Sequence, residues 1–241
     1  MLLLLTGKMN TSDPMTLKSP DVHGSLDPYL TYLGDFSVSE IKYRLEHYFK
    51  FVIVREPFER IVSAFRNKFE TNTTSSQYFR KQFGRKIIDS YRENPKKRSL
   101  RYGDDLTFKE FVLYLTDSKR RVPLNEHWEK FYELCHPCLV NYDFIGKLPS
   151  IDEDSKYILS RINSGRKIKF PTRSESKYAN RGADSYMSSY YSKIPRPYLR
   201  KLYEAYRPDF AIFNYTIPEV LRPMLAVKRS KRDRHLPDMN Y

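Results

Sequence analysis

Hydrophobic and polar residues follow two periods along this chain, and together they predict helices separated by short strands. Residues 37–49 carry apolar side chains at helical spacing, and Ser37 with Glu40 form a capping-box pattern at the beginning of that helix. Residues 50–55 contain four successive apolar residues, which is typical of a strand buried on both faces in a parallel sheet. Residues 57–69 begin with a proline, which suits the first turn of another helix.

The same alternation continues in the rest of the chain. Apolar spacing predicts a second strand over residues 142–147, and further helices over residues 107–115, 150–162 and 195–206. Ser150 with Glu153 form a capping pattern at the beginning of the second of these helices. Helices that alternate with short apolar strands indicate an α/β fold with a parallel sheet flanked by helices.

Residues 70–104 are polar and basic, and residues 163–185 are irregular and basic. No internal repeat and no interdomain linker is visible in the sequence, so we expect one domain over residues 1–222. Residues 223–241 form a basic tail that we expect to be disordered.

Composition excludes several classes of protein. Of the 241 residues, 40% are hydrophobic and 15% are aromatic, which is too many for a wholly disordered chain. The two cysteines are too few for a disulfide-rich miniprotein or for a four-cysteine zinc module. No apolar run in the sequence approaches the ~20 residues that span a bilayer.

The charge balance indicates an anionic partner. Lys and Arg number 43 against 29 Asp and Glu, which gives a formal net charge of +14. Nucleic acid, an acidic membrane, an acidic polysaccharide and a phosphorylated cofactor all suit this charge. Nine of the basic residues lie between Arg80 and Arg101, where they form either a track for an acidic glycan or a solvated basic loop. The sequence shows no zinc finger, RNP signature or helix-turn-helix pattern, which argues against nucleic acid.

The segment FVIVREPFERIVSAFRNK, residues 51–68, carries the most chemical information. It predicts a strand, a tight turn and a helix, and ligands of open α/β sheets bind beyond the carboxyl ends of strands. Arg55 lies at such an end, where backbone N–H groups and the helix dipole favour a phosphate. Its guanidinium can bind a phosphate through two parallel hydrogen bonds, and Ser63 can reach the same group. The alternative is an ordinary strand–helix unit with an Arg–Glu pair at its edge.

The pattern Arg55-Glu56-Pro57-(x)2-Arg60-(x)2-Ser63-Ala64-Phe65-(x)2-Lys68 resembles the 3′-phosphate-binding motif of Golgi carbohydrate sulfotransferases. The likeness is closest to the chondroitin/dermatan 4-O, N-acetylgalactosamine 4-O and HNK-1 group, and it covers residues 5–222. It continues in further motifs, among them Tyr102-Gly103-Asp104-Asp105, Asn125-Glu126-His127-Trp128 and Asp209-Phe210-(x)2-Phe213-Asn214-Tyr215.

This resemblance implies a fold similar to that of P-loop kinases and a transfer reaction without a metal. A sulfonate group would move from 3′-phosphoadenosine-5′-phosphosulfate to a glycan hydroxyl, first of all position 4 of N-acetylgalactosamine in chondroitin or dermatan. Acceptors with a glycoprotein N-acetylgalactosamine or a glucuronic acid are the alternatives. The implied cofactor-binding residues are Arg55, Glu56, Pro57, Arg60 and Ser63. The implied location is the Golgi lumen, where full-length members are type II membrane proteins.

One part of the family's pattern is not found in the sequence. The family has an upstream loop after its first, central strand that cradles the 5′-phosphosulfate, whereas residues 1–7 match the stretch just after that loop. We therefore expect a chain truncated at its N-terminus, without this first strand, the loop and the membrane anchor. A second function is then possible, in which an inactive remnant binds acidic glycans.

Sulfonate transfer to a hydroxyl needs a base, and histidine suits this role near neutral pH. His23 resembles in position a catalytic histidine of the related uronosyl 2-O-sulfotransferases, and we favour it as the catalytic base. His127 is the alternative, because a carboxylate precedes it and Trp128 follows with a ring on which sugar could stack. The other interpretation of Trp128 is an anchor in the core.

Two other features bear on the compartment of the chain. The motif Cys135-His136-Pro137-Cys138 is a weak zinc signal without a second pair. We expect its cysteines to be structural, in a mutual disulfide or in bonds to residues lost by the truncation. Three glycosylation sequons, at Asn10, Asn72 and Asn214, fit a secreted or Golgi-lumenal chain.

Overall fold

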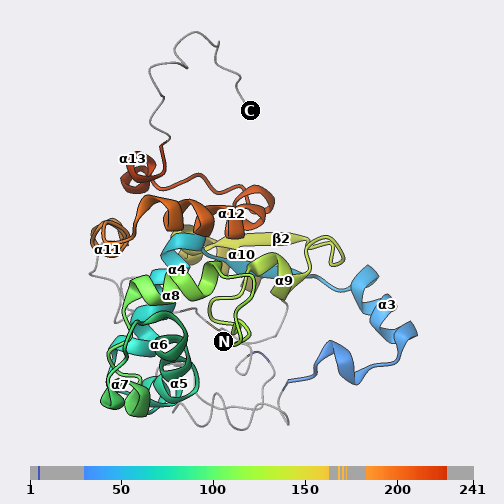
Figure 1. Cartoon of the computed structure of the whole chain (residues 1–241). Coiled ribbons are helices and arrows are strands. Elements are labelled where there is room, and N and C mark those ends of the chain that lie inside the picture. The colour runs from blue at the N-terminus through green and yellow to red at the C-terminus, as the bar shows by residue number, and fades with distance from the viewer. Residues whose placement is uncertain are drawn as a thin grey trace. The chain divides into compact units, whose positions relative to one another are not determined.

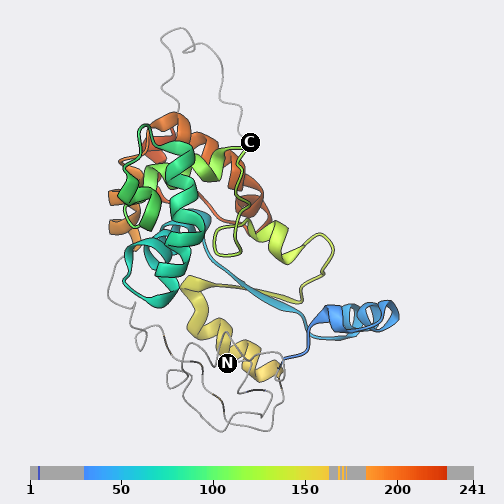
Figure 2. The same cartoon turned by 60° about the horizontal axis from the view of Figure 1, so that its bottom comes forward.

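The computed structural model describes Leu5, residues 30–162, residues 168, 170 and 172, and residues 183–226. These residues belong to two compact units (Figure 1, Figure 2). The first unit comes from Met1–Glu56 and Glu129–Arg181, and the second from Pro57–Trp128 and Gly182–Tyr241. None of the described helices is long and apolar enough to cross a membrane.

The first unit contains a parallel pair of strands, β1 (Phe51–Val54) and β2 (Phe144–Lys147). Both strands lie within their predicted segments, and Val54 is opposite Lys147 in the register. The expected burial of the first strand on both faces is wrong, because Val54 is the only buried residue of β1. Among the described residues, the main element that packs on this sheet is helix α10 (Ile151–Arg161), which lies against β2.

Helix α3 (Val38–His47) begins as its sequence predicts. The Ser37 hydroxyl accepts a hydrogen bond from the Glu40 N–H, and the Ser37 N–H donates to the Glu40 carboxylate at 3.1 Å. No side chain of α3 is buried within the described part of the chain. Local contacts support it instead, since the Arg44 guanidinium lies 3.3 Å from the centroid of the Phe36 ring.

Helix α10 begins with a different cap from the predicted one. The Ser150 hydroxyl donates to Asp154 Oδ2 at 2.8 Å, and the Lys147 N–H donates to the same oxygen at 2.7 Å. Ser150 ends a 3-10 turn, η5 (Leu148–Ser150), so its backbone lacks the extended conformation of an N-cap residue. The predicted Ser150–Glu153 capping box is therefore wrong, although the helix lies where it was expected.

The second unit packs its helices around an aromatic core. Its longer helices are α4 (Pro57–Phe65), α8 (Phe108–Thr116), α11 (Ala183–Tyr191) and α12 (Arg196–Ile212), and α12 lies beside α8 (Figure 1). A π-helical turn, η3 (Arg66–Glu70), continues α4 and confirms the helix predicted over residues 57–69. The apolar stripe of this helix is buried, namely Phe58, Ile61, Val62, Phe65 and Phe69.

The two other helices predicted in this unit are confirmed, one of them with a later end. Helix α8 begins with a capping box in which Thr107 Oγ1 accepts from the Glu110 N–H at 3.2 Å. Helix α12 continues six residues beyond its predicted end at residue 206. The extension is explained by the buried Phe210, whose ring packs on that of Phe58 with the centroids 5.4 Å apart.

The basic segment over residues 70–104 is largely helical, which corrects its interpretation as a loop. It contains α5 (Thr74–Phe79), the π-helical turn η4 (Arg80–Gly84), α6 (Arg85–Tyr91) and α7 (Lys97–Tyr102). Phe79 and Ile87 are buried in the core of the second unit, and Phe83 packs against that core. These residues recur every four positions, which is helical spacing, but the charged residues between them concealed the period.

Short helical elements complete the described structure: η2 (Leu33–Asp35), α9 (Phe131–Cys135), η7 (Glu219–Leu221) and α13 (Arg222–Leu225). The single domain over residues 1–222 stays a prediction. Most of the predicted tail, from residue 227 onward, lies outside the described residues.

Candidate functional site

The connection between β1 and α4 is two residues long. β1 ends at Val54 and α4 begins at Pro57, so Arg55 and Glu56 form the whole turn. Arg55 thus follows the carboxyl end of a strand in a parallel sheet, as predicted. The Nε atom of Arg55 and the Oε1 atom of Glu56 are buried, although each residue as a whole is partly exposed. The guanidinium of Arg55 is therefore partly buried at this edge of the sheet.

The other predicted cofactor-binding residues are on α4 in the second unit. Pro57 is buried at the first position of the helix and has no N–H to donate. One turn later, Arg60 Nη2 donates to the backbone carbonyl of Glu126 at 2.7 Å. Ser63 is partly buried and lies two residues before the end of α4. Arg60 therefore links α4 to the turn that contains His127, a connection that the sequence did not reveal.

His127 is oriented by the residues that precede it. Its Nδ1 lies 2.6 Å from Asn125 Oδ1, and its backbone N–H donates to the same oxygen at 3.1 Å. Because an amide oxygen only accepts hydrogen bonds, Nδ1 is the donor in this contact. Glu126 Oε1 lies 3.3 Å from Nδ1, and the side chain of His127 is 35% exposed. The side chain of Asn125 thus orients the ring of His127.

Trp128 is a core residue, and the idea that sugar stacks on its ring is wrong. Its relative exposure is 0%, and its ring packs against Phe69, Phe83 and Phe111. The indole N–H donates to the Tyr114 hydroxyl at 3.2 Å. The buried ring of Trp128 therefore anchors the turn that carries His127 to the core.

Lys68 is a further candidate site residue. The sequence analysis did not propose it, although it is the last residue of the motif that begins at Arg55. Its ammonium lies 4.7 Å from the centroid of the Phe79 ring, and the His127 ring packs edge-on against the same ring at 5.2 Å. Burial lowers the pKa of Lys68, and the charge of Glu126 opposes this shift. Lys68 and His127 thus flank one aromatic ring within the second unit.

The structure does not connect the other predicted residues, namely His23, the sequon asparagines and the two cysteines, with this site. His23 and Asn10 lie outside the described residues, so the role of His23 stays a prediction. Asn72 and Asn214 are both exposed. No disulfide joins Cys135 to Cys138, both of which lie in the described part of the chain.

No metal-binding cluster is found among the described residues, where no three His, Cys, Asp or Glu side chains come together. The Tyr142 hydroxyl donates to the Cys135 carbonyl at 2.7 Å, so the CxxC turn is tied to the start of the β2 segment.

Comparison with known proteins defines the family. The sequence model of the sulfotransferase family matches residues 1–216. This chain therefore belongs to that family. It is 42% identical over 224 residues to carbohydrate sulfotransferase 11 of Mus musculus, with 92% of this chain and 62% of the relative covered.

More distant relatives carry similar names. The chain is 40% identical to carbohydrate sulfotransferase 9 of Homo sapiens, with 79% of the chain and 42% of the relative covered. It is 35% identical to carbohydrate sulfotransferase 12 of Xenopus laevis, with 87% and 51% covered. The chain thus spans between 42% and 62% of the length of these curated relatives. No solved structure matches it significantly.

Proposed function

We propose that this chain is a carbohydrate sulfotransferase that moves a sulfonate group from 3′-phosphoadenosine-5′-phosphosulfate to position 4 of N-acetylgalactosamine in chondroitin or dermatan. The observation that carries the proposal is the match to the sulfotransferase family over residues 1–216. The names of the relatives support a carbohydrate acceptor. A P-loop-kinase-like fold and a location in the Golgi lumen belong to the same proposal.

Arg55, Arg60 and Ser63 would bind the 3′-phosphate of the donor. Two guanidinium groups and a hydroxyl suit a phosphate, since each supplies hydrogen-bond donors and Arg can bind two oxygens at once. Pro57 and Glu56 would act differently, because Pro57 begins the helix and the Glu56 carboxylate repels an anion. Their contribution is to shape the backbone of the turn.

The donor supplies the sulfonate group for attack by a sugar hydroxyl. That hydroxyl must lose its proton as its oxygen bonds to sulfur, and we propose His23 as the group that accepts it. His127 is the alternative base, and the orientation of its ring by Asn125 supports it. The cations of the site would stabilise the negative charge that collects on the leaving nucleotide.

The first test is a thermal-shift titration with 3′-phosphoadenosine-5′-phosphate. A ligand at about 100 times its Kd stabilises a protein by about 2.7 kcal/mol, which corresponds to a rise in Tm of roughly 5–10 °C for a chain of this size. We expect this rise in the parent and in Arg207→Ala, which removes an exposed arginine of α12. Arg55→Ala should lose it. An equal rise in Arg55→Ala, or none in the parent, would contradict the proposed phosphate site.

The second test separates the two histidines. Sulfonate transfer from labelled donor to chondroitin should fall at least 100-fold in the variant that lacks the true base, as general bases contribute about 10²–10⁴-fold. We expect His23→Ala to show this loss and His127→Ala to keep most of the activity. The opposite pattern would transfer the role of base to His127.

A further inference from the structure

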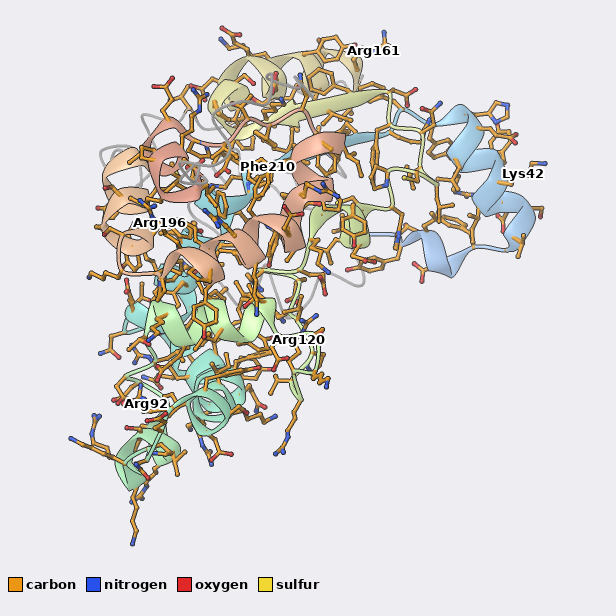
Figure 3. All side chains as sticks on the ribbon, turned by 45° about the horizontal axis from the view of Figure 1, so that its top comes forward. Lys42, Arg92, Arg120, Arg161, Arg196 and Phe210 are labelled. Atoms are coloured by element: carbon orange, nitrogen blue, oxygen red, sulfur yellow. The ribbon has the colours of Figure 1, made fainter. Side chains whose placement is uncertain are left out.

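The nine basic residues between Arg80 and Arg101 divide into two sets in the structure. Four arginines bind their own chain, and Figure 3 labels one of them, Arg92. Arg80 donates to the carbonyls of Phe69 and Thr71, at 2.9 and 3.0 Å. Arg85 donates to the carbonyl of Leu100 at 2.7 Å.

The other two arginines of this set form ion pairs. Arg98 binds Asp104 through two bonds of 3.0 and 2.7 Å. Arg92 binds Asp105 at 2.6 Å and Glu110 at 2.6 and 2.9 Å. These four arginines therefore stabilise the fold, and four of the nine cationic side chains of this segment are already bound within the chain.

The second set consists of five exposed cations, here called the outward basic set: Lys81, Lys86, Lys96, Lys97 and Arg101. Within the described residues, no hydrogen bond or ion pair engages their charged groups. Two exposed acids, Asp89 and Glu93, lie in the same stretch of chain, so the outward basic set keeps a net positive charge. Tyr102 lies next to it, 46% exposed, with the Arg101 guanidinium 5.4 Å from the ring centroid.

The backbone beneath the outward basic set is held in place. A Cβ atom on Gly84 would lie 2.5 Å from the carbonyl oxygen of Gly103, so η4 and the end of α7 touch through their backbones. Gly103 itself has a φ of +63°, which favours glycine. Because the two helices are tied in this way, their exposed cations belong to a preformed surface, which reduces the entropy lost on binding.

We propose that the outward basic set, with the exposed ring of Tyr102, binds an acidic polysaccharide outside the reacting sugar. A single exposed ion pair is worth very little, so these cations require a ligand that presents many anions in a row. A polyanionic sugar chain does so and also offers the faces of its rings to an aromatic side chain. This inference rests on the proposed function and extends it. The acceptor is then a polymer that is held both at the reacting sugar and at the outward basic set.

The test measures binding apart from transfer. The probe is a chondroitin sulfate chain of about 20 sugars, and the variant is Lys96→Gln/Lys97→Gln/Arg101→Gln. We expect roughly tenfold weaker binding and a shallower salt dependence, because three exposed ion pairs are lost. The matched control is Lys42→Gln/Lys193→Gln/Lys201→Gln, which removes the same charge from exposed lysines elsewhere. Equal weakening in both variants would mean general charge attraction and would overturn the proposal.

Two comparisons separate this inference from the proposed function. If the triple variant loses transfer to the polymer relative to transfer to a short oligosaccharide, both stand. If no transfer occurs with any acceptor but the polymer still binds through the outward basic set, the proposed function fails and the inference stands. Tighter binding of single-stranded DNA than of chondroitin sulfate through the same residues would overturn the assignment to a polysaccharide.

Discussion

Glu110→Gln is the most informative perturbation of the second unit, because it keeps the shape of the side chain and removes one charge. Glu110 is 7% exposed in the first turn of α8. Its two carboxylate oxygens accept from Arg92 Nε at 2.6 Å and from Arg92 Nη2 at 2.9 Å. One of these oxygens also accepts from the N–H and the hydroxyl of Thr107, both at 2.8 Å.

The size of the effect follows from what Arg92 retains. Removing one partner of a buried ion pair costs about 3–5 kcal/mol, since the other charge is left without compensation. Here Arg92 keeps Asp105 at 2.6 Å, and its side chain is 21% exposed to water. The amide oxygen of Gln can also keep the bonds from Thr107. We therefore expect a loss of about 2–3 kcal/mol, or roughly 5–10 °C in Tm.

The pH dependence has a definite sign. Burial by itself raises the pKa of Glu110, but the hydrogen bonds from Arg92 and Thr107 outweigh it, and the pKa is lowered overall. A carboxyl with a lowered pKa in the folded state stabilises the fold above its unfolded pKa. This contribution is lost as the pH falls through the folded pKa. The difference in the free energy of unfolding between parent and variant should thus have its full size at pH 7. It should shrink as the pH falls below the range in which carboxyl groups usually titrate.

The assay is urea unfolding of both proteins at pH 7 and in a series of acidic buffers. Glu204→Gln is the control, because Glu204 and its partner Arg207 are 62% and 67% exposed and their pair is worth at most about 1 kcal/mol. If Glu110→Gln is no more destabilising than this control, the buried network does not support the fold as argued. A constant difference at all pH values would refute the role of the charge.

Two further substitutions test the packing of the second unit. Gly84→Ala should cost about 1–3 kcal/mol in urea unfolding, because its Cβ would press on the Gly103 carbonyl, whereas Gly34→Ala meets nothing within 4 Å and should be nearly neutral. Equal effects would contradict the close backbone contact. Trp128→Ala should cost about 3–5 kcal/mol, since it removes a fully buried ring. The parent, with one tryptophan, should show blue-shifted emission that moves to longer wavelength on unfolding, and emission typical of exposed tryptophan before unfolding would contradict the buried position.

Local signals in the sequence predicted most of the elements. The capping box at Ser37 was correct because it depends on residues within one helical turn. The cap of α10 was wrong because the chain enters that helix through a 3-10 turn, which moves the bond from Glu153 to Asp154. A competing local conformation therefore overrode a correct pattern.

The candidate site could be predicted only in part. The position of Arg55 after β1 followed from the strand, turn and helix in the sequence. The link from Arg60 to Glu126 spans 66 residues, and no periodicity signals it. The Lys68 ammonium and the His127 ring contact Phe79 from different segments, so their proximity also depended on packing.

The sequence by itself determined the family, the strand–turn–helix motif and the positions of most helices, because these depend on motifs and on neighbours along the chain. Only the tertiary structure decided which charges are available to a partner. Arg92 reaches Glu110 across 18 residues and Arg80 reaches Phe69 across 11, while Lys96 and Lys97 remain exposed. In the sequence, each Arg and each Lys counts equally as one positive charge. Packing alone determines which of them binds its own chain, since that requires an acceptor brought near by the fold.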